Sequence, residues 1–95
     1  MHIISRKKIN DFANNHPSAK PSLQFWYRIV KKERFKSFDH LRHFFPKADK
    51  VGKLTVFDIG GNKFRLIAAI HYNRQKMYIR SILTHKEYDE AKWKE

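Results

Sequence analysis

The chain has 95 residues, which suits one domain, and its hydrophobic share of 41% is sufficient for a single core. Its 21 Lys and Arg residues against 9 acidic residues give a net charge of +12, which favours a polyanionic partner such as nucleic acid, although an acidic protein also fits. The absence of cysteine excludes disulfides, thiolate metal sites and thiol redox chemistry.

The first half of the chain has helical periodicity after a short strand. Residues 2–4 are predicted to form the strand, and Ser5 to cap a first helix that ends at Pro17. Ser18 is predicted to cap a second helix. The apolar stripe of that second helix consists of Leu23, Trp26, Tyr27 and Val30.

A third, shorter helical piece is predicted from Ser37 to Pro46, followed by a polar loop over residues 47–53. His40 and His43 lie three positions apart in it, a spacing that metal ligands use. No carboxylate or further histidine is placed to complete such a site, so we expect exposed histidines and neither a metal nor another cofactor.

The second half changes to the alternation typical of strands. Gly60-Gly61 is predicted to form a two-residue hairpin turn, and residues 73–76 a four-residue turn. The strands expected around these turns are 54–59, 62–72 and 77–84, and residues 85–93 have a helix-forming composition.

These turns fix a register for the strands, which we expect to be free of bulges. Asp58 would then face Lys63, and Arg65 would face Thr84. The basic residues expected on the face turned away from the helices are Lys63, Arg65, His71 and Arg80.

The residue types on that face fit cleavage of RNA without a metal. Val56, Ile67 and Ile82 would make the face partly apolar, and arginines with little water around them bind phosphate strongly. In RNA the 2′-hydroxyl can attack the adjacent phosphate while Arg and Lys hold the developing charge and a His moves a proton. A solvated basic face without catalytic function is the alternative.

His85 and Tyr88 follow the last strand and lie three positions apart, so both side chains lean to one side of a helical turn. We expect that side to face Arg65 and Arg80. One of the two would move the 2′-hydroxyl proton, and the other would orient the phosphate or protonate the leaving oxygen. Which of them is the general base stays open, and both could instead simply pack the C-terminal segment.

Two segments, Gly60–Ile67 and Thr84–Asp89, are the most distinctive parts of the chain. Together with further segments, these two resemble the HigB toxins of the RelE/ParE superfamily over nearly the whole chain. The further segments that share the resemblance are residues 1–5, 26–27, 44–46, 56–59, 70–73 and 78–80.

The resemblance implies an α+β fold, RelE/ParE-like, with two N-terminal helices packed on an antiparallel β-sheet and a short C-terminal helix, as one toxin domain over residues 1–95. It implies a type II toxin, a metal-independent endoribonuclease that cleaves mRNA, often in the ribosomal A site. It also implies a HigA-like helix-turn-helix antitoxin, through which alone the toxin would meet operator DNA.

Carried over to this sequence, the resemblance matches Arg65 and Arg80 to phosphate-binding arginines and His85 and Tyr88 to the catalytic C-terminal region. Three further basic residues are expected to bind RNA: Lys63, His71 and Arg74. Two other functions stay open, a ParE-like topoisomerase inhibitor without nuclease activity and a plain RNA-binding module. The arginines together with His85 favour the nuclease.

No apolar stretch approaches the roughly 20 residues of a membrane-spanning helix. The first residues, Met1–Arg6, reach a charge at once and lack the apolar centre of a signal peptide. We therefore expect a cytoplasmic protein without membrane contact.

Overall fold

The computed structural model describes residues 1–90 and 93 and has helices on one face of a mixed five-stranded sheet. The N-terminal part consists of β1 (His2–Ile4), α1 (Arg6–Asn15), a 3₁₀ turn (Pro17–Ala19), α2 (Lys20–Lys32) and α3 (Phe38–Phe44). The remainder consists of β2 (Asp49–Val51), β3 (Leu54–Ile59), β4 (Phe64–His71), β5 (Lys76–Thr84) and α4 (His85–Asp89). The α+β, RelE-like fold is thereby confirmed.

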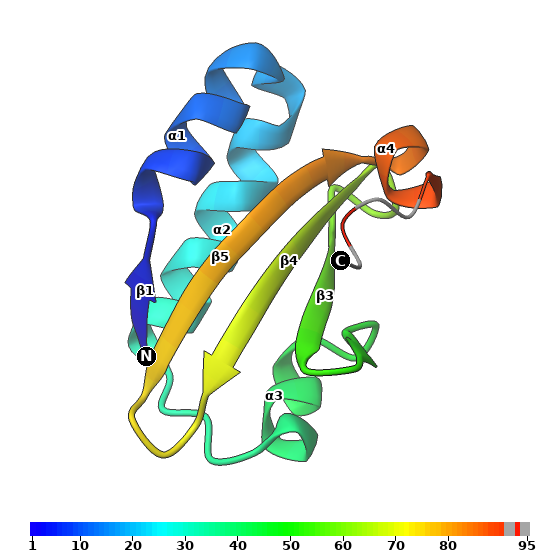
Figure 1. The fold of residues 1–95 in the computed structure, drawn as a ribbon. Helices are drawn as coiled ribbons and strands as arrows, with labels where there is room; N and C mark the ends of the chain where they lie inside the picture. Colours follow the sequence, from blue (N-terminus) through cyan, green and yellow to red (C-terminus); the bar gives the residue numbers. More distant parts are fainter. Residues whose placement is uncertain (91–92, 94–95) are drawn as a thin grey trace.

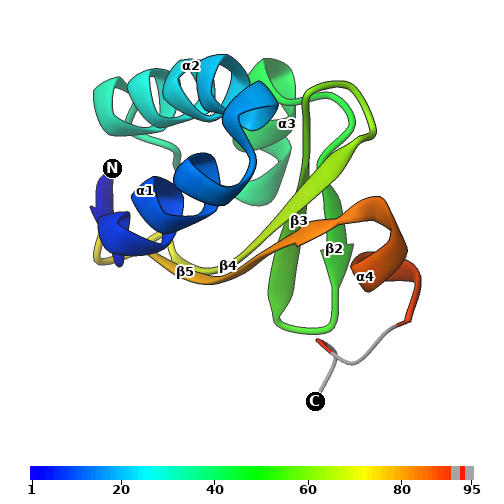
Figure 2. The same cartoon turned by 90° about the horizontal axis from the view of Figure 1, so that it is seen from above.

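The strands lie in the order β1-β5-β4-β3-β2, and every neighbouring pair is antiparallel except β1 and β5, which are parallel. Figure 1 shows α1 and α2 side by side behind β5 and β4. Seen from above in Figure 2, α4 lies on the opposite side of the sheet from α1 and α2. The sheet therefore carries its hydrophobic core on one face and α4 on the other.

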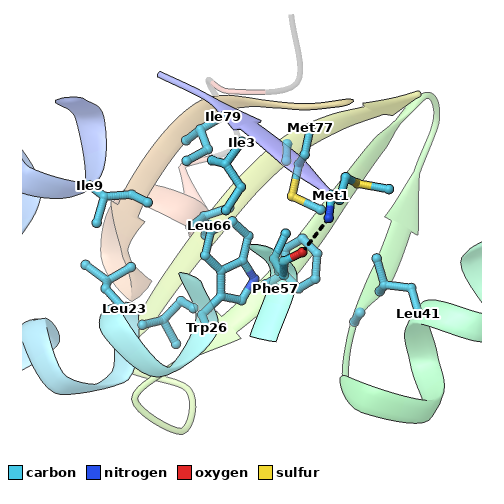
Figure 3. Packing of buried hydrophobic residues seen from close by; sticks show 14 of the residues in the cluster. Met1, Ile3, Ile9, Leu23, Trp26, Leu41, Phe57, Leu66, Met77 and Ile79 are labelled. Carbon is cyan, nitrogen blue, oxygen red and sulfur yellow. Dashed lines mark hydrogen bonds between the residues drawn. The ribbon is translucent and has the colours of Figure 1, made fainter. Parts of the chain in front are cut away.

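The core forms where the apolar stripes of the helices meet the inward side chains of the central strands. Trp26 and Leu23 of α2 are almost fully buried. The Trp26 ring packs edge-on against the ring of Phe57 of β3, with 5.3 Å between the ring centroids. Figure 3 shows these residues packed with Leu66 and Met77 from β4 and β5. The apolar stripe predicted for the second helix is thereby confirmed at Leu23, Trp26 and Val30, which are buried.

Helix starts were predicted with mixed success. Ser37 caps α3, since its Oγ accepts a hydrogen bond from the backbone N–H of His40 at 3.1 Å. Ser5 precedes α1 but makes no side-chain capping bond, and Ser18 lies inside the 3₁₀ turn, so both capping predictions are wrong. The expected polar loop at 47–53 also contains a strand, β2.

The hairpin register differs from the expected one. Gly60–Lys63 forms a four-residue turn in which both glycines adopt positive φ, so Ile59 pairs with Phe64 and Asp58 pairs with Arg65. The predicted two-residue turn is wrong because Asn62 and Lys63 belong to the turn as well. Lys63 therefore lies on an exposed turn rather than on the strand face.

A β-bulge interrupts the β4–β5 ladder, contrary to the expectation of a regular register. Ile67 pairs with Ser81 while Ala68 pairs with Ile79, which leaves Arg80 as the extra residue. Strict alternation after Ile79 would turn Ser81 inward and Ile82 outward. The bulge reverses this, and Ile82 packs against the core, so it is not part of the opposite face as predicted.

The final helix is shorter than expected. It ends at Asp89, and residues 91, 92, 94 and 95 lie outside the described part of the chain. Of the helices that the structure describes, none combines the length and apolar character that crossing a bilayer requires.

Candidate active site

Arg65 is the centre of a cluster on the sheet face opposite α1 and α2. Its neighbours Phe64 and Leu66 turn into the core, so the Arg65 side chain points to the other face, where only 12% of it is exposed. Its Nε lies 3.3 Å from the carboxylate of Asp58, the cross-strand partner. Its Nη1 donates to the carbonyls of Asn62 and Phe64 at 2.8 and 3.2 Å.

These contacts leave one guanidinium nitrogen for a ligand. Within residues 1–90 and 93, Nη2 of Arg65 has no hydrogen-bond partner, and its two N–H groups are the donors that can bind a phosphate oxygen. Because the other nitrogens are held by Asp58 and the turn, the guanidinium is fixed in place before any ligand arrives.

A capping box positions α4 beside this arginine. The Thr84 hydroxyl accepts a hydrogen bond from the N–H of Glu87 at 3.2 Å, and the Glu87 carboxylate accepts one from the N–H of Thr84 at 2.9 Å. The first N–H of the helix, that of His85, donates to the Lys63 carbonyl at 3.0 Å. Helix α4 is thereby tied to the β3–β4 turn.

The Tyr88 ring lies over Arg65, with the guanidinium carbon 5.3 Å from the ring centroid. The same ring stacks on the Trp93 ring, with 4.9 Å between the ring centroids. Burial raises the pKa of the Tyr88 hydroxyl, the negative charge of Asp49 raises it further, and the charge of Arg65 acts in the opposite direction. A phenol with a raised pKa stays protonated at neutral pH. Tyr88 can therefore donate a hydrogen bond.

His85 is exposed and pairs with a carboxylate one helical turn further on. Its Nδ1 lies 3.1 Å from Oδ2 of Asp89. A carboxylate at Nδ1 orients the imidazole and leaves Nε2 to contact a substrate. His85 therefore has the geometry of a general base.

The remaining predicted site residues lie farther away. Arg80 is exposed at the bulge, about 10 Å along β5 from the residue that pairs with Arg65. His71 and Arg74 lie at the far end of the β4–β5 hairpin, about 20 Å along the strand from Arg65. The structure thus places Tyr88 on Arg65 and ties the backbone of His85 to the turn at Lys63, whereas Arg80, His71 and Arg74 lie outside this cluster.

Side chains for a metal site are not assembled in the part of the chain that the structure describes, where no group of three or more His, Asp or Glu is placed to hold an ion. His40 and His43 instead make local contacts. His40 Nδ1 accepts from the N–H of Lys36 at 3.0 Å, and His43 Nδ1 lies 2.9 Å from the Asp39 carbonyl.

The family model of the HigB toxins, described as the RelE-like toxic component of a toxin-antitoxin system, matches residues 19–91. The chain belongs to the HigB toxin family. This confirms the resemblance found in the sequence and makes the cluster around Arg65 part of a HigB-type toxin.

Individual HigB proteins are similar over most of their length. The mRNA interferase toxin HigB of Escherichia coli (strain K12) is 38% identical over 92 residues, which cover 94% of this chain and 88% of the relative. The mRNA interferase HigB of Shigella flexneri gives the same values. That of Escherichia coli O6:H1 is 34% identical, over 94% of this chain and 89% of the relative.

Three residues of the cluster around Arg65 were not predicted from the sequence. Asp58 was expected to face Lys63 across the hairpin, because the turn was predicted to be two residues shorter than it is. Asp89 lies four positions after His85, a spacing that by itself indicates a side-chain pair on a helix. Trp93, the stacking partner of Tyr88, follows a segment whose path the sequence pattern does not define.

Thr84→Ala is expected to lower the free energy of unfolding by ~1 kcal/mol, the usual effect of losing an N-cap, and to reduce RNA cleavage because it loosens α4. Urea unfolding and a cleavage assay measure the two effects. Ser37→Ala is the matched control, since it removes the cap of α3 and should lower stability similarly while leaving cleavage intact. Equal cleavage by both variants would contradict the importance of the α4 cap.

Proposed function

We propose that this chain is a metal-independent endoribonuclease, an mRNA interferase that cuts mRNA on the translating ribosome. Membership of the HigB family makes it the toxic component of a toxin-antitoxin system, and the similar proteins are named mRNA interferases. The observation that carries the proposal is the placement of Tyr88 over a preordered Arg65, with His85 on the same short helix.

The proposed reaction is transfer of the phosphate within the RNA. His85 removes the proton of the 2′-hydroxyl through Nε2, and the 2′-oxygen attacks the adjacent phosphorus. Arg65 binds a non-bridging oxygen through Nη2 and stabilises the charge that develops on it. Tyr88, which lies over Arg65, gives its proton to the departing 5′-oxygen or orients the phosphate. The products are a 2′,3′-cyclic phosphate and a 5′-hydroxyl.

The other basic residues extend this site along the RNA. Arg80 is proposed to hold the phosphate together with Arg65, and Lys63 to bind the RNA backbone beside the turn. At a distance of about 20 Å, His71 and Arg74 would contact a different stretch of RNA, in the mRNA or the ribosome. No cofactor is needed for this chemistry.

The partner proposed to neutralise the chain is a HigA-like helix-turn-helix antitoxin, and operator DNA would be contacted only through that antitoxin. We place this reaction in the cytoplasm, where the ribosomes are, and assign it to one RelE-like domain over residues 1–95. A ParE-like action on a topoisomerase has no need of the pairing between Arg65 and Tyr88. A gene for a small helix-turn-helix protein beside that of the chain would support the assignment.

Analysis of the cut RNA ends tests the mechanism. After induction of the chain, primer extension on cellular mRNA should locate discrete cuts, and the downstream fragments should carry 5′-hydroxyl ends that require phosphorylation before ligation. Cleavage should persist in excess EDTA under conditions that keep the ribosomes intact. Ends carrying 5′-phosphate, or activity restored specifically by one divalent ion, would contradict metal-independent transfer.

A further inference from the structure

Three consecutive basic residues begin α1, and each of them has a different kind of partner. The guanidinium carbon of Arg6 lies 4.8 Å from the centroid of the Tyr27 ring, and Lys7 pairs with a carboxylate one turn along α1 at 3.1 Å. Lys8 instead contacts the sheet, since its Nζ donates a hydrogen bond to the backbone carbonyl of Arg80 at 2.8 Å. Lys8 therefore joins the helical layer to the bulge of β5.

The backbone at Arg80 receives little support from the sheet itself. Arg80 is the extra residue of the bulge and has no partner residue on β4. On the other edge of β5, β1 pairs only with residues 76–78, so no described strand lies beside Arg80 there. The hydrogen bond from Lys8 has a charged donor, which makes it stronger than a bond between neutral groups. It fixes the orientation of a peptide group that the ladder does not pair.

This orientation decides where the Arg80 side chain points. Ile79 before the bulge and Ile82 after it both pack against the helix-side core, and two residues, Arg80 and Ser81, lie between them. Strict alternation would leave a single residue between two inward side chains, so the bulged backbone has more freedom to rotate. Burial of Ile82 maintains the bulge, and the Lys8 contact fixes the direction of Arg80 within it.

We propose that Lys8 is a positioning residue for RNA cleavage, which holds the Arg80 side chain in the direction from which its guanidinium binds the phosphate. This inference rests on the role of Arg80 in the function proposed above. Lys8 acts from α1, which lies on the opposite side of the sheet from α4 (Figure 2). The helical layer thus contributes to the geometry of the RNA-cleaving face without contacting the RNA.

The test compares Lys8→Met with Lys7→Met in single-turnover cleavage of ribosome-bound mRNA. Methionine keeps the apolar stem of Lys8 but cannot donate, so the rate should fall by about fivefold, the ratio that corresponds to one net hydrogen bond. Lys8→Arg keeps a charged donor and should restore most of the rate. Lys7→Met removes the same charge from the neighbouring position and should cleave at the wild-type rate. A wild-type rate for Lys8→Met would overturn the proposal.

A double substitution separates positioning from direct contact with RNA. If Lys8 acts through Arg80, Lys8→Met should not lower the residual rate of Arg80→Ala any further, since residues that act as a unit have non-additive effects. An equal loss in both backgrounds would overturn the proposal. So would ribosome binding whose logarithmic salt dependence falls by about one in Lys8→Met, the sign of a lost phosphate contact. A wild-type rate for Arg80→Ala would instead remove Arg80 from the proposed function, and this failure is thereby distinguished from one at Lys8 alone.

The backbone amide of Ser81 reports on the contact directly, because it belongs to the same peptide group as the Arg80 carbonyl. Its NMR chemical shift should change in Lys8→Met and stay unchanged in Lys7→Met, while urea unfolding shows that both variants are folded. An unchanged Ser81 signal in folded Lys8→Met would contradict the proposed contact.

Discussion

Arg65→Ala is expected to reduce mRNA cleavage by about a hundredfold to a thousandfold, the usual loss when one preorganised donor to a developing charge is removed. The guanidinium is held by Asp58 and by the carbonyls of Asn62 and Phe64, so its Nη2 needs no reorganisation to bind the phosphate. The rate of cleavage of ribosome-bound mRNA under single-turnover conditions measures the effect.

Two further variants make this result specific. Arg65→Lys keeps the positive charge but cannot contact Asp58, the turn and a phosphate at once, so it should recover little of the lost rate. Arg80→Ala should also abolish toxicity, and with less effect on stability because Arg80 is exposed at the bulge. Wild-type cleavage by Arg65→Ala in a folded protein would remove this arginine from the mechanism.

His85→Gln is expected to reduce the cleavage rate by about a hundredfold or more, the usual contribution of a general acid or base, while RNA and ribosome binding persist. Glutamine keeps polar atoms near Asp89 but cannot accept and release a proton near neutral pH. The comparison of dissociation constants with single-turnover rates separates binding from chemistry.

The companion variant Tyr88→Phe keeps the ring over Arg65 and on Trp93 but removes the hydroxyl. If Tyr88 protonates the leaving oxygen, this variant should also cleave slowly and should regain rate on substrates whose leaving group needs no proton. Near-wild-type cleavage by both His85→Gln and Tyr88→Phe would leave the arginines as the only catalytic groups.

The sequence predicted most elements of the fold, but it failed on the details that place side chains opposite each other. Alternation in β3 and β4 shows which residues turn inward, yet it does not give the length of the Gly60–Lys63 turn, because glycines with positive φ serve both short and longer turns. The bulge at Arg80 was missed for a related reason. It is favoured by burying Ile82, a tertiary effect that a local pattern does not contain.

Prediction of the candidate site had the same limits. The sequence indicated Arg65, Arg80, His85 and Tyr88 as one group. The structure places Arg65 and Tyr88 in contact on the face opposite α1 and α2, whereas Arg80 lies about 10 Å away along β5. The sequence could not show that Asp58 holds Arg65, since that contact depends on the turn length. The short strand β2 was also missed, because three residues, two of them charged, give no clear alternation.

The parallel pairing of β1 with β5 has a consequence for the speed of folding. His2 pairs with Lys76, so this contact closes a loop containing most of the chain, whereas β3, β4 and β5 are joined by short hairpins. Loop closure costs entropy before the distant contact can stabilise the fold, and chains rich in such contacts fold slowly. Docking of β1 is therefore expected to be a late step, after the hairpins formed by β3, β4 and β5.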